Sequence, residues 1–164
     1  MIGILKLTNK LVGFIKTAIN ILLFSLIVVV FLSAMSRSFN FPVPWAIDVS
    51  LILFTWFSFL AISLASYRRS HPKVDLFLEK LNEKASKSIL IIQNILVIGF
   101  LSLLLFYIFK YANENSMRQI VSLGIGFSWI TSAGIIGIGL MLYFEVINLI
   151  KVLSGKEYKE VAVK

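Results

Sequence analysis

Histidine and the carboxylates are the side chains with which this chain could perform acid–base or metal chemistry, and it has few of them. His71 is the single histidine and stands four residues before Asp75, so a helix would place both side chains on one face. A carboxylate that orients an imidazole can make it a general base. The alternative is a cap and turn before a surface helix, and we favour that interpretation.

The other common catalytic and metal-binding patterns are absent from the sequence. The 164 residues include no cysteine, which excludes disulfides, thiolate metal sites and cysteine nucleophiles. One histidine cannot build a histidine metal cluster, and there is no glycine-rich phosphate loop or nucleophile elbow. Asp48 and Asp75 are expected on opposite sides of a membrane, so they cannot act as a carboxylate pair. We predict a protein that is not an enzyme and uses no cofactor or metal.

Groups that could carry a solute across a membrane are also scarce. Transport pathways normally need polar or ionisable groups, or broken helices, at mid-membrane. Asp48 and Glu145 lie near the ends of apolar segments. The polar side chains deeper in those segments are mainly hydroxyls: Ser25, Thr55, Ser58, Ser63, Ser102 and Thr131. An autonomous small transporter or channel is therefore the alternative hypothesis, not the favoured one.

The elements that must position these residues are long apolar helices. Hydrophobic residues make up 59% of the chain, well above the usual share of about 45–50%, and they gather in runs of about twenty residues, enough to cross roughly 30 Å of hydrocarbon. We predict an all-α membrane protein with one transmembrane domain, residues 17–150. Its four spans cover about residues 17–36, 46–66, 88–109 and 123–150. The last is longer than needed, so a tilt or an early non-helical stretch would absorb the surplus.

Polar segments flank these spans. Residues 1–16 carry basic and polar side chains at three- and four-residue steps, which predicts an amphipathic helix in the headgroup region. An extension of the first span is the alternative. Residues 70–87 show helical spacing of apolar residues opposite charged ones, which predicts a short amphipathic helix on the membrane surface. Residues 151–164 form a polar tail.

The placement of lysine and arginine predicts the orientation. The N-terminal segment, the middle loop and the tail share one side of a four-span topology and contain 13 of the 16 basic residues. The opposite side has Arg37, Lys110 and Arg118. Because basic loops stay in the cytoplasm, both termini are predicted to be cytoplasmic. The net charge of +8 is then explained by orientation, and the basic segments would also contact anionic phospholipid. Nucleic acid is not needed as a partner to explain the charge.

Two features indicate helix packing. Small residues recur at steps of four, seven and four in the fourth segment, on one predicted face: Ser122, Gly126, Ala133 and Gly137. Small side chains let helix backbones approach closely in lipid. The second span is rich in aromatic residues, which would fill either the core of this chain or a contact with a larger partner.

One run of motifs resembles a known family. In order, it contains Arg37, then Pro44-Trp45-Ala46-Ile47-Asp48, then Leu53-Phe54-Thr55-Trp56-Phe57-Ser58-Phe59-Leu60-Ala61, then Arg68-Arg69-Ser70-His71-Pro72-Lys73-Val74-Asp75. It is similar to the small membrane subunit, DctQ-like, of tripartite ATP-independent periplasmic (TRAP) transporters. Three positions depart from the family pattern: Asp48 replaces the usual glutamate, Ala61 a glycine and Pro72 an apolar residue.

The resemblance implies a scaffold. Such subunits brace a large, elevator-type membrane subunit that imports an organic acid with sodium, and a periplasmic protein delivers the acid. Sialic acid is the substrate we would name, without a residue that supports it. The resemblance assigns interface or structural roles to Arg37, Trp45, Asp48, Trp56, His71 and Asp75, and it allows Arg37 to pair with Asp48. Lys110, Glu114 and Arg118 would lie on the side where the periplasmic protein docks.

Overall fold

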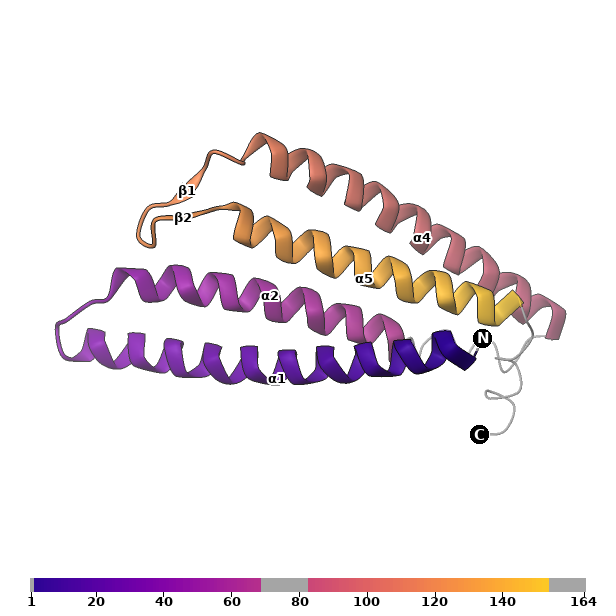
Figure 1. Cartoon of the computed structure of the whole chain (residues 1–164), viewed down its shortest axis with the longest axis horizontal. Helices are drawn as coiled ribbons and strands as arrows, with labels where there is room; N and C mark the ends of the chain where they lie inside the picture. Colours follow the sequence, from indigo (N-terminus) through magenta and orange to yellow (C-terminus); the bar gives the residue numbers. More distant parts are fainter. Residues whose placement is uncertain (1, 69–82, 154–164) are drawn as a thin grey trace.

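The computed structural model describes residues 2–68 and 83–153, which form four long helices and a short hairpin (Figure 1). The helices are α1 (Ile2–Ser38), α2 (Pro44–Arg68), α4 (Glu83–Glu114) and α5 (Ser128–Leu153). The strands β1 (Gln119–Ile120) and β2 (Ile125–Gly126) pair antiparallel between α4 and α5. Each helix contains a stretch long and apolar enough to cross a membrane. The predicted class, an all-α membrane protein with four transmembrane helices, is confirmed.

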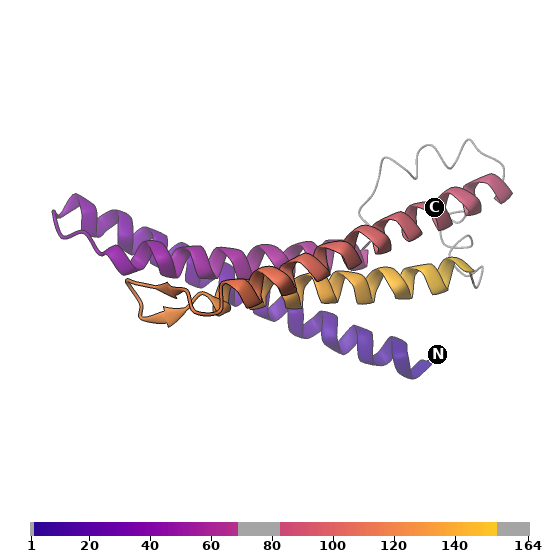
Figure 2. The same cartoon turned by 90° about the horizontal axis from the view of Figure 1, so that it is seen from above.

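The helices form a layer instead of a bundle around one core. α1 packs mainly on α2, α2 on α5, and α5 on α4, so their order in space is α1, α2, α5, α4 (Figure 1). Figure 2 shows that the layer is twisted, because the starts of α1 and α4 diverge to opposite sides of α5. α5 is by far the most buried of the four helices.

Two small apolar clusters hold the layer together. Val12 and Ile15 of α1 pack with Leu60 of α2 and Phe144 of α5. The second cluster joins α4 to α5 and is built around Leu101, Ile138 and Met141. Most other large apolar side chains of α1 and α4 are exposed, as expected for helices that face lipid or a membrane partner.

The turn between α1 and α2 ends the first helix by a defined cap. Asn40 has a positive φ of 60°, and its amide donates to the Arg37 carbonyl while the Phe41 amide donates to the Ser36 carbonyl. This hydrogen-bond pair is a Schellman cap, for which asparagine is a suitable residue. Pro44 then begins α2, where the missing amide hydrogen costs nothing.

Three boundaries differ from the prediction. Residues 2–16 are the start of α1 and not a helix of their own, which corresponds to the alternative of an extended first span. α4 begins at Glu83, so the end of the predicted 70–87 helix belongs to α4; residues 70–82 lie outside the described part of the chain. α5 begins at Ser128, because residues 119–126 form the hairpin.

Candidate functional site

Polar side chains gather at both ends of the layer. The hairpin end consists of the α1–α2 turn, residues 39–43, and the loop between α4 and α5, residues 115–127 (Figure 1). The opposite end contains the start of α1 and the ends of α2 and α5 (Figure 1). We call it the terminal end.

At the hairpin end, Asp48 connects the hairpin to α2. Asp48 lies near the start of α2, where the helix dipole favours a negative charge. The hydroxyl of Ser122 in the hairpin donates a hydrogen bond to its carboxylate. Arg37 is exposed, and the structure shows no ion pair between Arg37 and Asp48. Asp48 is therefore used inside the chain, whereas Arg37 presents its charge to the outside.

The two tryptophans of α2 have different surroundings. Trp45 is half exposed beside the exposed Phe39 and Phe41 of the turn, an arrangement typical of a membrane–water interface. Trp56 donates from its indole Nε1 to the carbonyl oxygen of Trp129 at 3.1 Å. Trp56 therefore links α2 to the first turn of α5, and its polar atom is satisfied within the chain.

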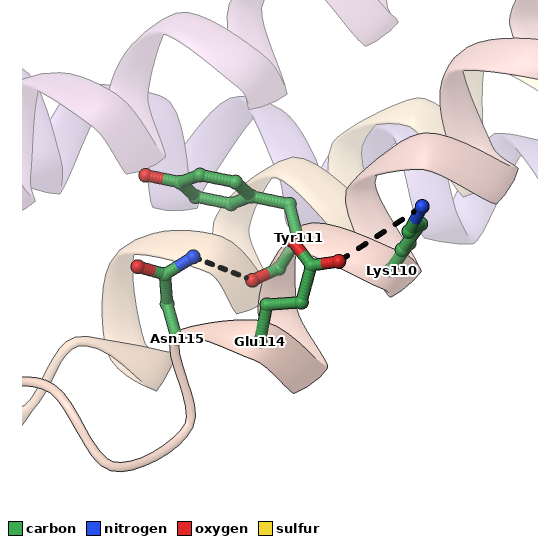
Figure 3. Close-up of polar contacts among 4 residues, drawn as sticks. All are labelled: Lys110, Tyr111, Glu114 and Asn115. Carbon is green, nitrogen blue, oxygen red and sulfur yellow. Dashed lines mark hydrogen bonds and ion pairs between the residues drawn. The ribbon is translucent and has the colours of Figure 1, made fainter.

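Lys110, Glu114 and Arg118 lie close together in sequence but form two separate contacts. The Lys110 Nζ and Glu114 Oε1 atoms are 3.9 Å apart on the surface of α4 (Figure 3), a geometry that contributes little to stability when both groups are solvated. The guanidinium of Arg118 instead lies 4.6 Å from the ring centroid of Phe127, and Tyr111 meets the same ring edge-on. Arg118 thereby helps to hold the hairpin against the end of α4.

The predicted face of small residues needs a correction. Ala133 and Gly137 lie in α5 and are buried. Ser122 and Gly126 precede the helix, because Gly124 adopts a positive φ of 64° and the amide of Phe127 donates to the carbonyl of Arg118 across the hairpin. The four residues therefore do not share a helix face, since regular helical spacing does not extend through the hairpin.

A glycine that the sequence analysis did not select takes part in the α5 contact. A Cβ atom added at Gly137 would lie 2.5 Å from the Cβ of Phe59, and one added at Gly134 would lie 2.2 Å from the Cδ1 of Ile108. These two glycines let α2 and α4 approach α5 closely, as small residues do in membrane helices. The Gly-x-x-Gly spacing of Gly134 and Gly137 was the sequence feature that could have predicted this close contact.

The terminal end contains a buried polar cluster that sequence reasoning also missed. Glu145 is 8% exposed and accepts a hydrogen bond of 2.6 Å from the Ser66 hydroxyl. The hydroxyls of Thr8 and Tyr143 are 3.2 Å apart, and Tyr67 donates to Asn9 Oδ1 at 3.1 Å.

These bonds join α1, α2 and α5. Asn148, one turn after Glu145, is 2% exposed, and its Nδ2 has no hydrogen-bond partner among the described residues. Each of these polar contacts joins two helices, so we assign this cluster to helix packing. The three-residue steps from Ser63 to Ser66 and from Glu145 to Asn148 were the signal that could have revealed it.

His71 and Asp75 lie outside the described residues, so their predicted roles stay predictions. Within residues 2–68 and 83–153, no group of three or more potential metal-ligating side chains is present. The described part of the chain thus presents packing contacts and exposed faces.

The comparisons point to one group of proteins. The family model described as "Tripartite ATP-independent periplasmic transporters, DctQ component" matches residues 26–155. The sialic acid TRAP transporter small permease protein SiaQ of Vibrio cholerae is 26% identical over 157 residues, which cover 92% of this chain and 90% of that protein. The sialic acid TRAP transporter permease protein SiaT of Haemophilus influenzae is 26% identical over 155 residues. That match covers 94% of this chain but only 25% of the longer SiaT protein.

Proposed function

The chain belongs to the DctQ-component family of tripartite ATP-independent periplasmic transporters, and we propose that it is the non-catalytic small membrane subunit of a transporter that imports sialic acid. Both relatives are named as sialic acid transporter proteins, which supports this substrate over other carboxylates. The partners would be a large membrane subunit and a periplasmic protein that binds sialic acid. Sodium would drive import through the large subunit.

The observation that carries the proposal is the layer of four apolar helices with uncharged central segments. No Asp, Glu, Lys or Arg occurs in residues 17–36, 49–67, 88–109 or 127–144. A layer one helix thick leaves wide apolar faces uncovered, and coupling ions need polar or ionisable groups near mid-membrane. A helix layer of this kind suits a brace for a larger membrane protein better than a transport pathway.

The proposed setting is the bacterial cytoplasmic membrane with both termini inside. The bias of basic residues supports this orientation, since 13 of 16 fall on the side of the termini. The hairpin end, with Lys110, Glu114 and Arg118, would then face the periplasm, where the binding protein delivers its ligand. Anionic phospholipid would meet the basic cytoplasmic segments.

A co-purification experiment tests this proposal. The tagged chain is expressed with the large membrane subunit encoded beside it, extracted in mild detergent and sized. We expect a stable one-to-one complex, because the exposed faces need a membrane partner. A chain that elutes alone or only as a homo-oligomer would contradict the proposal, and solute flux through this chain alone would then become the question to test.

A further inference from the structure

Resting on the proposed function, we propose that a transmembrane helix of the large subunit packs along the outward stripe of α5. This stripe consists of Trp129, Ser132, Ile136, Gly139, Tyr143 and Val146. Four of the six are exposed to between 37% and 58%: Trp129, Ile136, Tyr143 and Val146. α2 and α4 pack against the other side of α5, and at the terminal end of the stripe the Tyr143 hydroxyl also contacts Thr8 of α1.

The spacing of the stripe fits a neighbouring helix. Trp129, Ile136 and Tyr143 are seven residues apart, and so are Ser132, Gly139 and Val146. Two positions that repeat every seven residues form the seam that one helix presents to another in left-handed packing, with a crossing angle of about 20°. The stripe extends through most of the membrane-spanning part of α5.

The stripe also alternates large and small side chains. Ser132 and Gly139 form low points between the bulky side chains of Trp129, Ile136 and Tyr143. The Ser132 hydroxyl is already satisfied, since it donates to the Trp129 carbonyl at 3.0 Å. Large side chains of a partner helix could therefore enter the low points without leaving a buried polar group unpaired.

Gly139 is the open glycine of α5: like Gly13 of α1 and Gly99 of α4, it has no close packing contact among the described residues that would require a glycine. An added Cβ at Gly139 would meet no atom within 4 Å, in contrast to the two glycines on the packed side of α5. A helical glycine carries a conformational cost relative to alanine, and a close approach of another backbone is the usual compensation in membrane helices. By comparison, the exposed side of α1 presents large residues such as Phe24, Ile27 and Phe31, which lipid chains can surround.

The large subunit is the occupant that the comparisons favour. In the Haemophilus influenzae relative, the part that matches this chain is one quarter of a single, longer permease polypeptide. The remaining three quarters therefore accompany that part at a fixed ratio of one to one. A second copy of this chain, or lipid alone, would not supply such a fixed neighbour.

Three open glycines provide a matched test. Gly13 in α1, Gly99 in α4 and Gly139 in α5 each have no atom within 4 Å of an added Cβ, but they lie on three different helices. The variants Gly13→Leu, Gly99→Leu and Gly139→Leu are each expressed with the large subunit. The measured quantities are the amount of large subunit recovered per tagged chain, and the thermal unfolding midpoint and oligomeric state of each variant alone.

We expect Gly139→Leu to reduce recovery of the large subunit about tenfold while the other two variants retain it. All three variants alone should unfold at or slightly above the wild-type temperature, because a helical glycine is replaced by a better helix former. This measurement separates lost docking from lost folding. As a second measurement, Ile136→Cys in this cysteine-free chain should cross-link to cysteines placed in helices of the large subunit.

The remaining outcomes overturn the inference in distinguishable ways. Loss of the complex with Gly99→Leu instead would assign the contact to the outer side of α4. If all three variants form the complex and Ile136→Cys gives no cross-link, the stripe faces lipid and not the large subunit. If the chain alone forms a dimer, and Gly139→Leu makes it monomeric while the complex with the large subunit stays intact, the stripe would be assigned to a second copy of this chain. If the wild-type chain forms no complex, the proposed function itself fails.

Discussion

Gly137 is the position where one added methyl group should harm the helix layer most. In Gly137→Ala the new Cβ would lie 2.5 Å from the Cβ of Phe59 and 3.1 Å from two of its ring carbons. The Phe59 Cβ is fixed by the α2 backbone, so a rotamer change cannot remove it. The contact is relieved only if α2 and α5 move apart.

The size of the effect follows from two opposing contributions. Overpacking of this kind costs about 1–3 kcal/mol, whereas replacing a helical glycine by alanine gains about 1 kcal/mol. We therefore expect Gly137→Ala to lower the free energy of unfolding by about 1 kcal/mol, with an upper limit of about 2 kcal/mol. In a chain of this length, each kcal/mol shifts the thermal midpoint by about 2–4 °C.

Gly134→Ala is the matched control. Its new Cβ would meet the Cδ1 of Ile108, the far end of a flexible side chain that can rotate away, and Phe59 only at 3.4 Å. We expect this variant to unfold within about 2 °C of the wild type. Both variants are purified alone in detergent and unfolded thermally under circular dichroism. A Gly137→Ala variant as stable as Gly134→Ala would refute the close contact between α2 and α5 at Phe59.

Three further predictions concern polar contacts and orientation. Trp56→Phe keeps an aromatic side chain but loses the hydrogen bond to the Trp129 carbonyl, so the free energy of unfolding should fall by about 0.5–1.5 kcal/mol for the bond alone. An unchanged thermal midpoint would show that this bond contributes nothing. Among the described residues, Ser66 makes the only hydrogen bond to the buried Glu145 carboxylate, so Ser66→Ala should lower the free energy of unfolding by about 1–3 kcal/mol. The double variant Ser66→Ala, Glu145→Leu should be more stable than Ser66→Ala. The reverse order would count against a buried charge there. Ser116→Cys should react with a membrane-impermeant maleimide in intact cells, and reaction only after lysis would reverse the predicted orientation.

The sequence was sufficient for the four spans because lipid imposes a simple length rule. Each uncharged run of about twenty residues is found in one of the long helices, and the prolines after Asn40 correctly separated the first two. The start of the fourth helix was less predictable. Residues 119–126 are as apolar as the helix that follows, and the pairing of β1 with β2 depends on the turn at Gly124, which apolar periodicity does not reveal.

The arrangement of the helices was beyond the reach of local patterns. A layer and a bundle need the same four apolar segments, and in lipid an apolar side chain can face either a neighbouring helix or the bilayer. The cluster of Ser66, Tyr67 and Glu145 was missed for the same reason. Ser66 and Tyr67 lie on α2 and Glu145 on α5, near span ends where polar residues are ordinary, and only the packing of α2 on α5 brings the two helices' side chains together.

Transport by reconstituted components tests the central claim most directly. Proteoliposomes are prepared with this chain alone, with the large subunit alone and with both, and uptake of labelled sialic acid is measured with the periplasmic binding protein and an inward sodium gradient. We predict uptake only when both membrane subunits are present, and none through this chain alone. Uptake by this chain alone, or full uptake without it, would contradict its assignment as a required, non-catalytic subunit.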